Sequence, residues 1–374
     1  MNSLFFDLIN DGHHFFYNYN VMKGNNGDKK YYFTSNSISS EGEDMLNGTK
    51  VKVIKAKVLK SNNRILRMMD QFIVLFKLRK LINKLNIDTT MLLYLDHMIL
   101  PLCIFQLVFP MRTKMIGTLH WFPNRSLKIK LLKKLSNKGL KIIVHTDDVK
   151  KKLRQVGIEN VEIIYYPTLE TSNIDKVEAK RKLSLKLDEK YKTILYFGGT
   201  RLDKGLDILL EALENVNMPI NLIIAGQEQT FKRDFIEMKI SSLSNKNVIL
   251  NLDYIRDEDI ELYFKSSDIV VLPYRKIFNG ESGILTEAIN NKNVVVLPNI
   301  IHFPSVIQKY SNGIVYDAEN VKDLAEKLEY VINNINLYEI GVKKAFEDYK
   351  EKHSLKYFAK RYEHVILHQV WEKI

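Results

Sequence analysis

Residues 279–287 read Asn-Gly-Glu-Ser-Gly-Ile-Leu-Thr-Glu and lie between two apolar runs, Asp268–Pro273 and Asn293–Pro298. Both runs have the length and composition of buried parallel strands, and the second half of the stretch predicts the start of a helix. Backbone amides at such a helix start can bind phosphate. From Ser282 to Glu287 a helix rises roughly 7.5 Å, about the span from a diphosphate to the ribose hydroxyls. The stretch therefore predicts a nucleotide site, or else an ordinary amphipathic helix whose Glu faces solvent.

The surrounding sequence, from residue 192 to about 334, alternates between strand and helix patterns. The predicted strands are Thr193–Phe197, Asn221–Ala225, Val248–Leu252, Ile269–Pro273, Val294–Pro298 and Gly313–Tyr316. The predicted helices are Leu206–Asn215, Phe231–Leu243, Asp257–Lys265, Ser282–Asn291 and Val321–Asn334. This alternation indicates a parallel sheet covered on both faces, which binds ligands at the carboxyl ends of its strands.

The first half shows the same alternation less cleanly. The predicted strands are Leu4–Ile9, Lys50–Val58, Met91–Leu95, Thr113–Leu119, Lys141–Val144 and Val161–Tyr166. A polar stretch rich in Lys and Glu, Tyr166–Asp188, marks the expected domain boundary, and Ser354 is a plausible cap for a last helix. We expect an α/β fold with two Rossmann-like domains, residues 1–168 and 169–352, and a C-terminal helix within residues 353–374.

The composition is that of a globular protein of 374 residues, with 45% apolar residues. A single cysteine, Cys103, excludes a disulfide framework and a thiolate metal cluster, and suits a reducing cytoplasm. No apolar run reaches the length of a membrane span, and the N-terminus lacks the basic region of a signal peptide. These features favour a cytoplasmic location.

Charge is distributed unevenly along the chain. Residues 1–165 hold 27 Lys/Arg and 13 Asp/Glu, whereas the remaining residues hold 29 and 31. Two basic amphipathic segments, Arg64–Lys84 and Arg125–Lys141, account for much of the excess. Helices of this kind bind anionic lipid, at about 1 kcal/mol per Lys or Arg near the surface. For either segment alone a packed helix with a solvated lysine face is the better explanation, but their occurrence together in one half of the chain favours a membrane surface.

Several segments resemble the "glycosyl transferases group 1" family, whose members are retaining glycosyltransferases of GT-B fold, glycosyltransferase family 4-like. Tyr196–Leu213 resembles the start of the family's nucleotide-sugar domain, and Asp268–Asn299 its donor site. Gly117–Phe122 is similar to the segment that carries an active-site His, and Val144–Asp148 and Ile163–Thr168 to the segments leading to the linker. The resemblance implies two Rossmann-like domains facing a central cleft, with the C-terminal helix crossing back to the first domain.

The resemblance also implies roles for individual residues of the second domain. Arg201 and Lys204, beside Gly198 and Gly199, match the family's phosphate-binding cations, and an Arg can hold a diphosphate bidentately. Glu287 matches the acid that bonds the ribose. The remaining donor-binding residues are implied to be Tyr254 and Ile255 near the base, and Ser282, Gly283, Ile284 and Leu285 around the phosphates.

In the first domain, His120 matches a histidine that in the family faces the donor sugar, and Gly12, His13 and His14 match the loop on the acceptor side. Two departures concern the donor. The family often has an acid eight positions before the ribose Glu, but here that position is Asn279, and Glu281 lies two positions away. Either residue could contact the sugar. The position directly after Gly198, often Arg in the family, is Gly199.

The function expected from these observations is transfer of a sugar from a nucleoside-diphosphate sugar, with UDP or GDP, to a lipid-linked or cell-surface glycan precursor. The resemblance implies retention of configuration without a metal or other cofactor, and the basic first half places the enzyme peripherally on the inner face of the cell membrane. Alternatives are a nucleotide-sugar epimerase of GT-B fold and a non-catalytic partner subunit. Nucleic-acid binding is disfavoured, because aromatics are not interleaved with the basic residues as on a single-strand groove.

Overall fold

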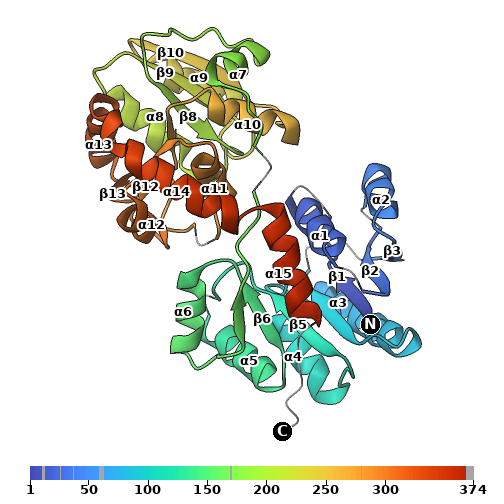
Figure 1. Cartoon of the computed structure of the whole chain (residues 1–374). Helices are drawn as coiled ribbons and strands as arrows, with labels where there is room; N and C mark the ends of the chain where they lie inside the picture. The colour runs from blue at the N-terminus through green and yellow to red at the C-terminus, as the bar shows by residue number, and fades with distance from the viewer. Residues whose placement is uncertain are drawn as a thin grey trace. The chain divides into compact units, whose positions relative to one another are not determined.

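The computed structural model describes residues 1–10, 13–25, 27–36, 38–58, 63–123, 125–168, 171–278 and 280–367. The chain divides into two compact units. Unit 1 comprises Met1–Pro167 together with Leu355–Ile374, and unit 2 comprises Thr168–Ser354. Figure 1 shows both units with their elements labelled.

Unit 1 is built on a parallel sheet, in which the described residues form seven strands in the order β3-β2-β1-β4-β5-β6-β7. The strands are β1 Asn2–Phe6, β2 Lys29–Ser35, β3 Val51–Ala56, β4 Thr89–Leu92, β5 Lys114–Thr118, β6 Lys141–Val144 and β7 Val161–Ile163. The order changes direction at β1, so the carboxyl ends of β1 and β4 form the switch point at which such sheets bind ligands.

Helices cover both faces of this sheet (Figure 1). They are α1 His13–Lys23, α2 Ser40–Asn47, α3 Arg64–Lys84, α4 Ile99–Val108, α5 Ser126–Asn137, α6 Asp147–Gln155 and α15 Leu355–Leu367. Strand β1 shows how the sequence specifies two cores, because alternate side chains of a strand point to opposite faces. Leu4 and Phe6 pack with the core formed by α3, α4, α5 and α6, whereas Phe5 packs with α1 and α15.

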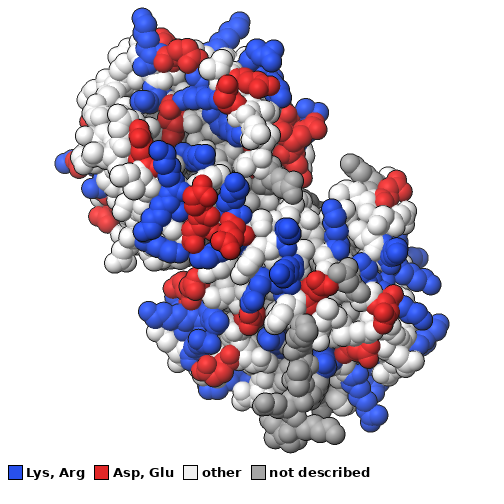
Figure 2. Space-filling view, in the orientation of Figure 1, with Lys and Arg blue, Asp and Glu red and all other residues white. Residues whose placement is uncertain are grey.

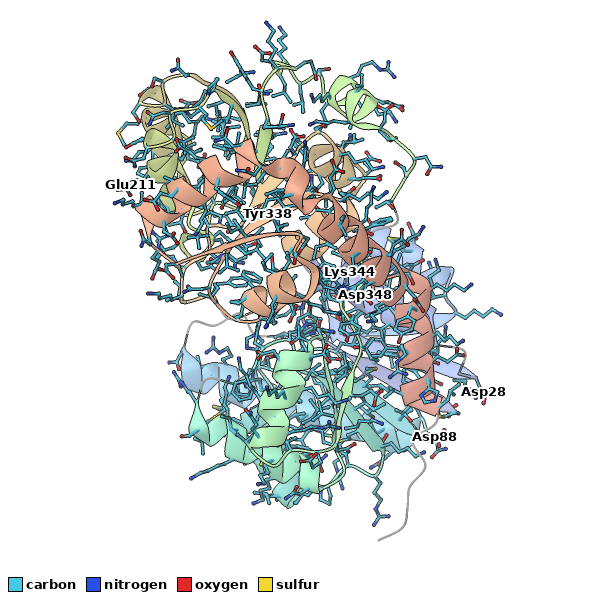
Figure 3. The ribbon with its side chains drawn as sticks, turned by 60° about the vertical axis from the view of Figure 1, so that its left-hand side comes forward. Asp28, Asp88, Glu211, Tyr338, Lys344 and Asp348 are labelled. Carbon is cyan, nitrogen blue, oxygen red and sulfur yellow. The ribbon has the colours of Figure 1, made fainter. Side chains whose placement is uncertain are left out.

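The amino-terminal edge of this sheet is fixed by acidic side chains. Asp28 pairs with the N-terminal ammonium of Met1, and the carboxylate of Asp88 accepts the backbone N–H of Asn2 at 2.7 Å. Figure 3 labels both aspartates at this edge. The first strand is therefore anchored between β2 and β4 at its very first residues.

Helix α15, the last described element, belongs to unit 1 although its sequence follows unit 2. Its Tyr362 hydroxyl lies 3.1 Å from the hydroxyl of Thr118 on β5 and is hydrogen-bonded to that of Tyr17 on α1. Arg361 forms an ion pair with Glu162 on β7. Burial of Phe358, Tyr362 and the other residues on the same side of the helix against the sheet explains the apolar spacing of this segment.

Unit 2 contains a second parallel sheet, whose six described strands have the order β10-β9-β8-β11-β12-β13. The strands are β8 Thr193–Phe197, β9 Ile220–Ala225, β10 Lys246–Asn251, β11 Ile269–Val271, β12 Val294–Pro298 and β13 Gly313–Tyr316. Ile194 and Tyr196 of β8 enter one core, and Leu195 and Phe197 enter the other. Both units are thus Rossmann-like, as the sequence predicts.

The helices of unit 2 pack on these two cores. They are α7 Lys176–Lys182, the 3-10 helix η1 Leu202–Lys204, α8 Leu206–Glu214, α9 Arg233–Ser241, α10 Asp257–Lys265, α11 Gly283–Asn290, α12 Phe303–Tyr310, α13 Val321–Asn333, the 3-10 helix η2 Ile335–Tyr338 and α14 Glu339–Lys352. Lys344 and Asp348 of α14, labelled in Figure 3, both contact Lys309 of α12.

The surface charge follows the uneven sequence. Figure 2 shows Lys and Arg side chains gathered at the edge of unit 1 that holds β2, β3 and α3, while both signs are interspersed on unit 2. Helix α3 has the bounds of the first basic segment, Arg64–Lys84. The second basic helix, α5, buries Leu132 and Leu135 and exposes Lys133 and Lys134. This arrangement fits the alternative expectation for α5, a packed helix with a solvated lysine face. No helix in the described ranges combines the length and apolarity needed to cross a bilayer.

Candidate functional site

The loop that follows β8 is tightly held at the carboxyl end of the unit 2 sheet. Gly198 has φ +112°, and a Cβ on Gly226, after β9, would lie 2.3 Å from the Gly198 carbonyl oxygen. Thr200 closes the loop, because its hydroxyl donates to the Phe231 carbonyl and accepts from the Gln229 amide, both at 2.7 Å. The backbone of Gly198 and Gly199 is therefore fixed by close packing that leaves no room for a side chain at Gly226, and by a positive φ at Gly198 that side-chain-bearing residues rarely adopt.

Two cations stand on this loop in different electrostatic states. The guanidinium of Arg201 is half-exposed and binds Asp203 bidentately, with Nε–Oδ1 at 2.9 Å and Nη2–Oδ2 at 2.6 Å. These hydrogen bonds raise the pKa of Arg201 above its ordinary value. Burial, followed by the charge of Arg201, lowers the pKa of Lys204 to about 7. Arg201 is thus permanently charged, whereas Lys204 titrates near neutral pH.

The N-terminus of α11 meets this loop. Ser282 caps the helix, as its hydroxyl accepts the Leu285 amide at 3.3 Å and lies 3.1 Å from the hydroxyl of Tyr274. Gly283 is exposed with open space around its Cα, and Ile284 Cδ1 lies 3.9 Å from where a Cβ of Gly198 would be. The first-turn amides of α11, which have no partner within the helix, therefore lie beside the loop of Arg201 and Lys204.

Acidic residues flank the same helix start. Glu287 is half-buried on the second turn of α11. Glu281 lies before the helix, 3.8 Å from the Nε2 atom of His302. His302 follows β12 and is absent from our expectations, although the position of its loop after a predicted strand could have identified it. Asn279, the other candidate for contacting the sugar, and Gly12 lie outside the described residues.

Tyr254 and Ile255 follow β10, which is separated from β8 by β9 in the sheet order. Tyr254 is 64% exposed, while Ile255 is half-buried against the core that also contains Phe197 and Leu285. A backbone role for this pair in holding a base remains a prediction.

In unit 1, His120 is buried at the carboxyl end of β5. Its Nε2 atom lies 3.0 Å from the carbonyl oxygen of Leu93, so Nε2 carries the proton and donates. Its ring stacks on Tyr94 with a centroid separation of 3.8 Å and lies 4.8 Å from the ring of His145. Burial, then the proximity of His145, lowers the pKa of His120 well below its ordinary value. His120 is therefore a neutral imidazole at physiological pH.

His14, on α1, stacks on Tyr94, the same ring on which His120 stacks. Its ring lies 3.6 Å from that of Tyr94, and its Nδ1 atom lies 3.2 Å from a carboxylate oxygen of buried Asp7. The structure thus joins His14 and His120 through Tyr94, a residue that the sequence did not single out. The side chain of His13, the other candidate, is not among those described.

Asp96 is a further buried acid that the sequence did not indicate. Its carboxylate accepts the backbone N–H groups of His120 and Trp121 at 3.1 and 3.0 Å, which fixes the loop after β5. Burial raises the pKa of Asp96 to about 6. The nearby His97 ring lies 6.1 Å from that of Trp121, and its pKa is lowered, first by burial and then by Lys128.

These contacts form a candidate anion site in unit 2 and a cluster of aromatic and imidazole rings in unit 1. Fixed cations and unpaired helix amides stabilise developing negative charge on a leaving phosphate. Within the described residues, no three His, Cys, Asp or Glu side chains come together as a metal site.

Comparisons with known proteins agree with this arrangement. Residues 177–352 match the family model described as "Glycosyl transferases group 1". An uncharacterized glycosyltransferase of Methanocaldococcus jannaschii is 26% identical over 188 residues, half of this chain and 47% of that protein. An uncharacterized glycosyltransferase of Haemophilus influenzae is 26% identical over 302 residues, 75% of this chain and 80% of the relative. This chain therefore matches about half the length of the first relative and most of the second.

The fold has close counterparts among solved structures. Anabaena HepE in complex with UDP superposes with a TM-score of 0.74 at 15% identity, covering 96% of this chain and 98% of HepE. The two Rossmann-like units and their helices are thus those of a GT-B fold. Within this fold, the C-terminal unit is the part of the chain that matches the group 1 glycosyltransferase family model.

Proposed function

We propose that this protein is a glycosyltransferase that moves a sugar from a nucleoside-diphosphate sugar, using UDP or GDP, to a glycan acceptor. The observation that carries the proposal is the meeting of Arg201 and Lys204 with the N-terminus of α11. A diphosphate at this point would be stabilised by a permanent cation, a titratable cation and helix amides. The bound UDP of the structurally similar HepE supports UDP as the first donor nucleotide to test.

The finer chemistry follows from the same groups. Arg201 and Lys204 supply the charge that a metal would otherwise contribute, so we propose metal-independent transfer. Glu287 binds the ribose, and the sugar contacts Asn279 or Glu281. Attack on the same face as the departing phosphate, with that phosphate assisting, retains the anomeric configuration without a nucleophilic carboxylate. His120 contributes a hydrogen bond or a packing surface at the reacting centre. Its lowered pKa keeps the imidazole neutral, and this disfavours a role as general acid.

The acceptor class is proposed from the surface of unit 1. On α3, Leu66, Met69, Ile73 and Phe76 are 44–56% exposed and recur at spacings of three and four residues. The exposed apolar residues of α4 are Leu100, Ile104, Leu107 and Val108. Phe76 joins the two helices, since its ring lies 4.9 Å from that of Phe105. We call the exposed apolar residues of α3 and α4 the α3–α4 strip.

Basic residues of α3 flank the α3–α4 strip, among them Arg67, Lys77, Lys80 and Lys84. An apolar strip bordered by cations is complementary to an anionic lipid bilayer. This supports a peripheral location on the inner face of the cell membrane and a lipid-linked or cell-surface glycan precursor as acceptor.

The donor proposal is tested by thermal unfolding and slow hydrolysis with UDP-, GDP- and ADP-sugars. We expect one nucleotide series to raise the melting temperature. Glu287→Gln should weaken that shift, and Glu211→Gln, on the exposed side of α8, serves as the matched control. If no nucleotide sugar shifts the melting temperature or is hydrolysed, the proposed donor site is refuted.

The membrane proposal is tested by sedimentation with vesicles of phosphatidylcholine, with and without phosphatidylglycerol. We expect binding only to the anionic vesicles, and Ile73→Glu should abolish it. Met238→Glu changes a similarly exposed apolar residue of α9 in unit 2 and should leave binding intact. Equal binding by the Ile73 variant and the wild type would exclude the α3–α4 strip as the contact.

A further inference from the structure

The ammonium of Lys204 lies against two buried aromatic rings, those of Tyr274 and Phe278, which together we call the aromatic box. Its Nζ atom is 3.7 Å from the ring centre of Tyr274 and 4.3 Å from that of Phe278. Among the described residues, no carboxylate lies within ion-pairing distance of this ammonium. Aromatic faces attract cations through the ring quadrupole. When Lys204 is protonated, its ammonium therefore faces aromatic rings instead of an anion.

The box is rigid because the loop after β11 is clamped to the loop after β8. Arg275 binds Asp207 bidentately at 2.9 and 2.5 Å, and its Nη1 also donates to the Leu202 carbonyl at 2.7 Å. The backbone N–H of Arg275 donates to the carbonyl of Asp203 at 3.0 Å. These bonds hold the backbone beside Tyr274 against the 3-10 helix that carries Lys204.

The contacts of the rings extend the box to the helix start. Tyr274 lies with its ring 4.5 Å from that of Phe278, and its hydroxyl is 3.1 Å from that of Ser282. Burial raises the pKa of Tyr274, so this hydroxyl is neutral and adds no countercharge. Lys204 itself retains partial exposure, which leaves one side of the residue open to a ligand.

The charged groups facing Lys204 come from its own loop. Arg201 disfavours its protonation and Asp203 favours it, but burial outweighs both. Glu281, before α11, lies against His302 from the loop after β12. The lysine thus shares its surroundings with one cation and one anion that are already paired with each other.

We propose that Tyr274 and Phe278 are positioning residues that make binding of the donor diphosphate at Lys204 a proton-coupled event. The inference rests on the proposed donor site. The diphosphate enters the open side of the box, and Nζ takes a proton from solvent as the anion arrives, because a nearby anion favours the charged ammonium. No bond is made or broken apart from this N–H bond. Donor affinity therefore falls, by up to about tenfold per pH unit, as the pH rises above neutrality.

The experiment is calorimetric titration of the full chain with UDP, and with GDP, at pH 7 and pH 8 in buffers of different ionisation enthalpy. At pH 8 the terminal phosphate of the nucleotide, with a pKa near 6, is already ionised. We expect uptake of up to about 0.9 proton per nucleotide at pH 8 and about 0.5 at pH 7. Binding without proton uptake overturns this inference but leaves the donor site standing, whereas no binding of either nucleotide overturns both.

Two variants separate a positioning role from a structural one. Lys204→Met should abolish proton uptake in whatever binding remains. Phe278→Leu keeps an apolar wall but removes one ring, so UDP should bind about two- to thirtyfold more weakly, with proton uptake at pH 7 increased. Phe235→Leu removes a ring from the stacked pair of Phe231 and Phe235 and should change neither quantity. If Phe278→Leu keeps both wild-type affinity and wild-type uptake, the box does not position the lysine.

Discussion

The substitution Lys204→Met should stabilise the protein while removing nucleotide binding. The pKa of Lys204, lowered by burial to about 7, lies well below that of an unfolded lysine, near 10.4. At pH 7 the lysine is almost fully protonated in the unfolded chain but only about half protonated in the folded chain, and the lowered pKa costs the folded state on the order of 4 kcal/mol. Methionine matches the unbranched shape of lysine and packs between Tyr274 and Phe278 without this cost.

The measured gain should be smaller than this ceiling, because methionine loses the attraction of two ring faces for a cation, about 0.5–2 kcal/mol each. We therefore expect a gain of up to roughly 3 kcal/mol at pH 7, measured by urea unfolding. The gain should shrink by about 1 kcal/mol for each pH unit between pH 7.5 and 9.5, because the folded-state pKa is depressed and the penalty on the wild type is relieved as the pH rises toward the unfolded value.

A matched control is Lys276→Met, which alters an exposed lysine on the loop after β11. It should change stability by less than about 0.5 kcal/mol at every pH. A Lys204→Met protein that is less stable than wild type at pH 7, or a stability difference that does not vary with pH, would refute the electrostatic account of this residue.

Three further predictions concern the supports of the two candidate sites. Gly205→Ala should cost more than about 2 kcal/mol of unfolding free energy, because Gly205 has φ +64° and a Cβ would lie 1.9 Å from the Pro273 carbonyl oxygen; urea unfolding measures it. Asp207→Asn should cost about 1–3 kcal/mol and weaken UDP binding, since it leaves the partly buried guanidinium of Arg275 without its carboxylate; calorimetry and urea unfolding give the two effects. Asp96→Asn should remove a loss of stability of roughly 2 kcal/mol that the wild type undergoes from pH 4 to pH 6, because the folded-state pKa of Asp96, about 6, exceeds the unfolded value; unfolding across this pH range tests it.

The second half of the chain was predictable because its strands are uninterrupted apolar runs. The predicted strand Thr193–Phe197 coincides with β8, and the predicted helix Ser282–Asn291 corresponds to α11, Gly283–Asn290, which Ser282 caps through its bond to the Leu285 amide. The predicted run Ile269–Pro273 is shortened to Ile269–Val271, where β11 ends before the loop that turns toward Lys204. Strand patterns thus located the ends of the sheet at which the candidate site lies.

Elements whose sequences lack a clear hydrophobic periodicity were not predicted. Helix α4, Ile99–Val108, is apolar on every side, so its exposed Leu107 and Val108 cannot be distinguished from its buried Leu102 by pattern. Strand β2, Lys29–Ser35, begins with two lysines and was not recognised. Both shape unit 1, the first as part of the α3–α4 strip and the second as the neighbour of β1.

The candidate site was predicted in its residue types but not in its contacts. Arg201 and Lys204 were implied by the resemblance of their segment to the family, yet the aromatic box depends on Tyr274 and Phe278, about seventy residues later in the chain. Such a contact arises from the neighbouring positions of β8 and β11 in the sheet order. A sequence pattern reports which strand ends carry polar residues, but not which side chains of two ends meet.

The positive charges of Arg201 and Lys204 are offset in different ways, and this difference affects which anions the site binds. Arg201 is neutralised by Asp203 in a half-exposed pair, and such pairs contribute only about 0–1 kcal/mol, so an anion of higher charge density can displace the carboxylate. Lys204 has no carboxylate partner in the described part of the chain to be displaced, but it must be protonated. A monoanion gains from one of these steps at a time, whereas a diphosphate can contact both cations and gain from both. The arrangement therefore favours diphosphates over single phosphates, and it does so most strongly at or below neutral pH.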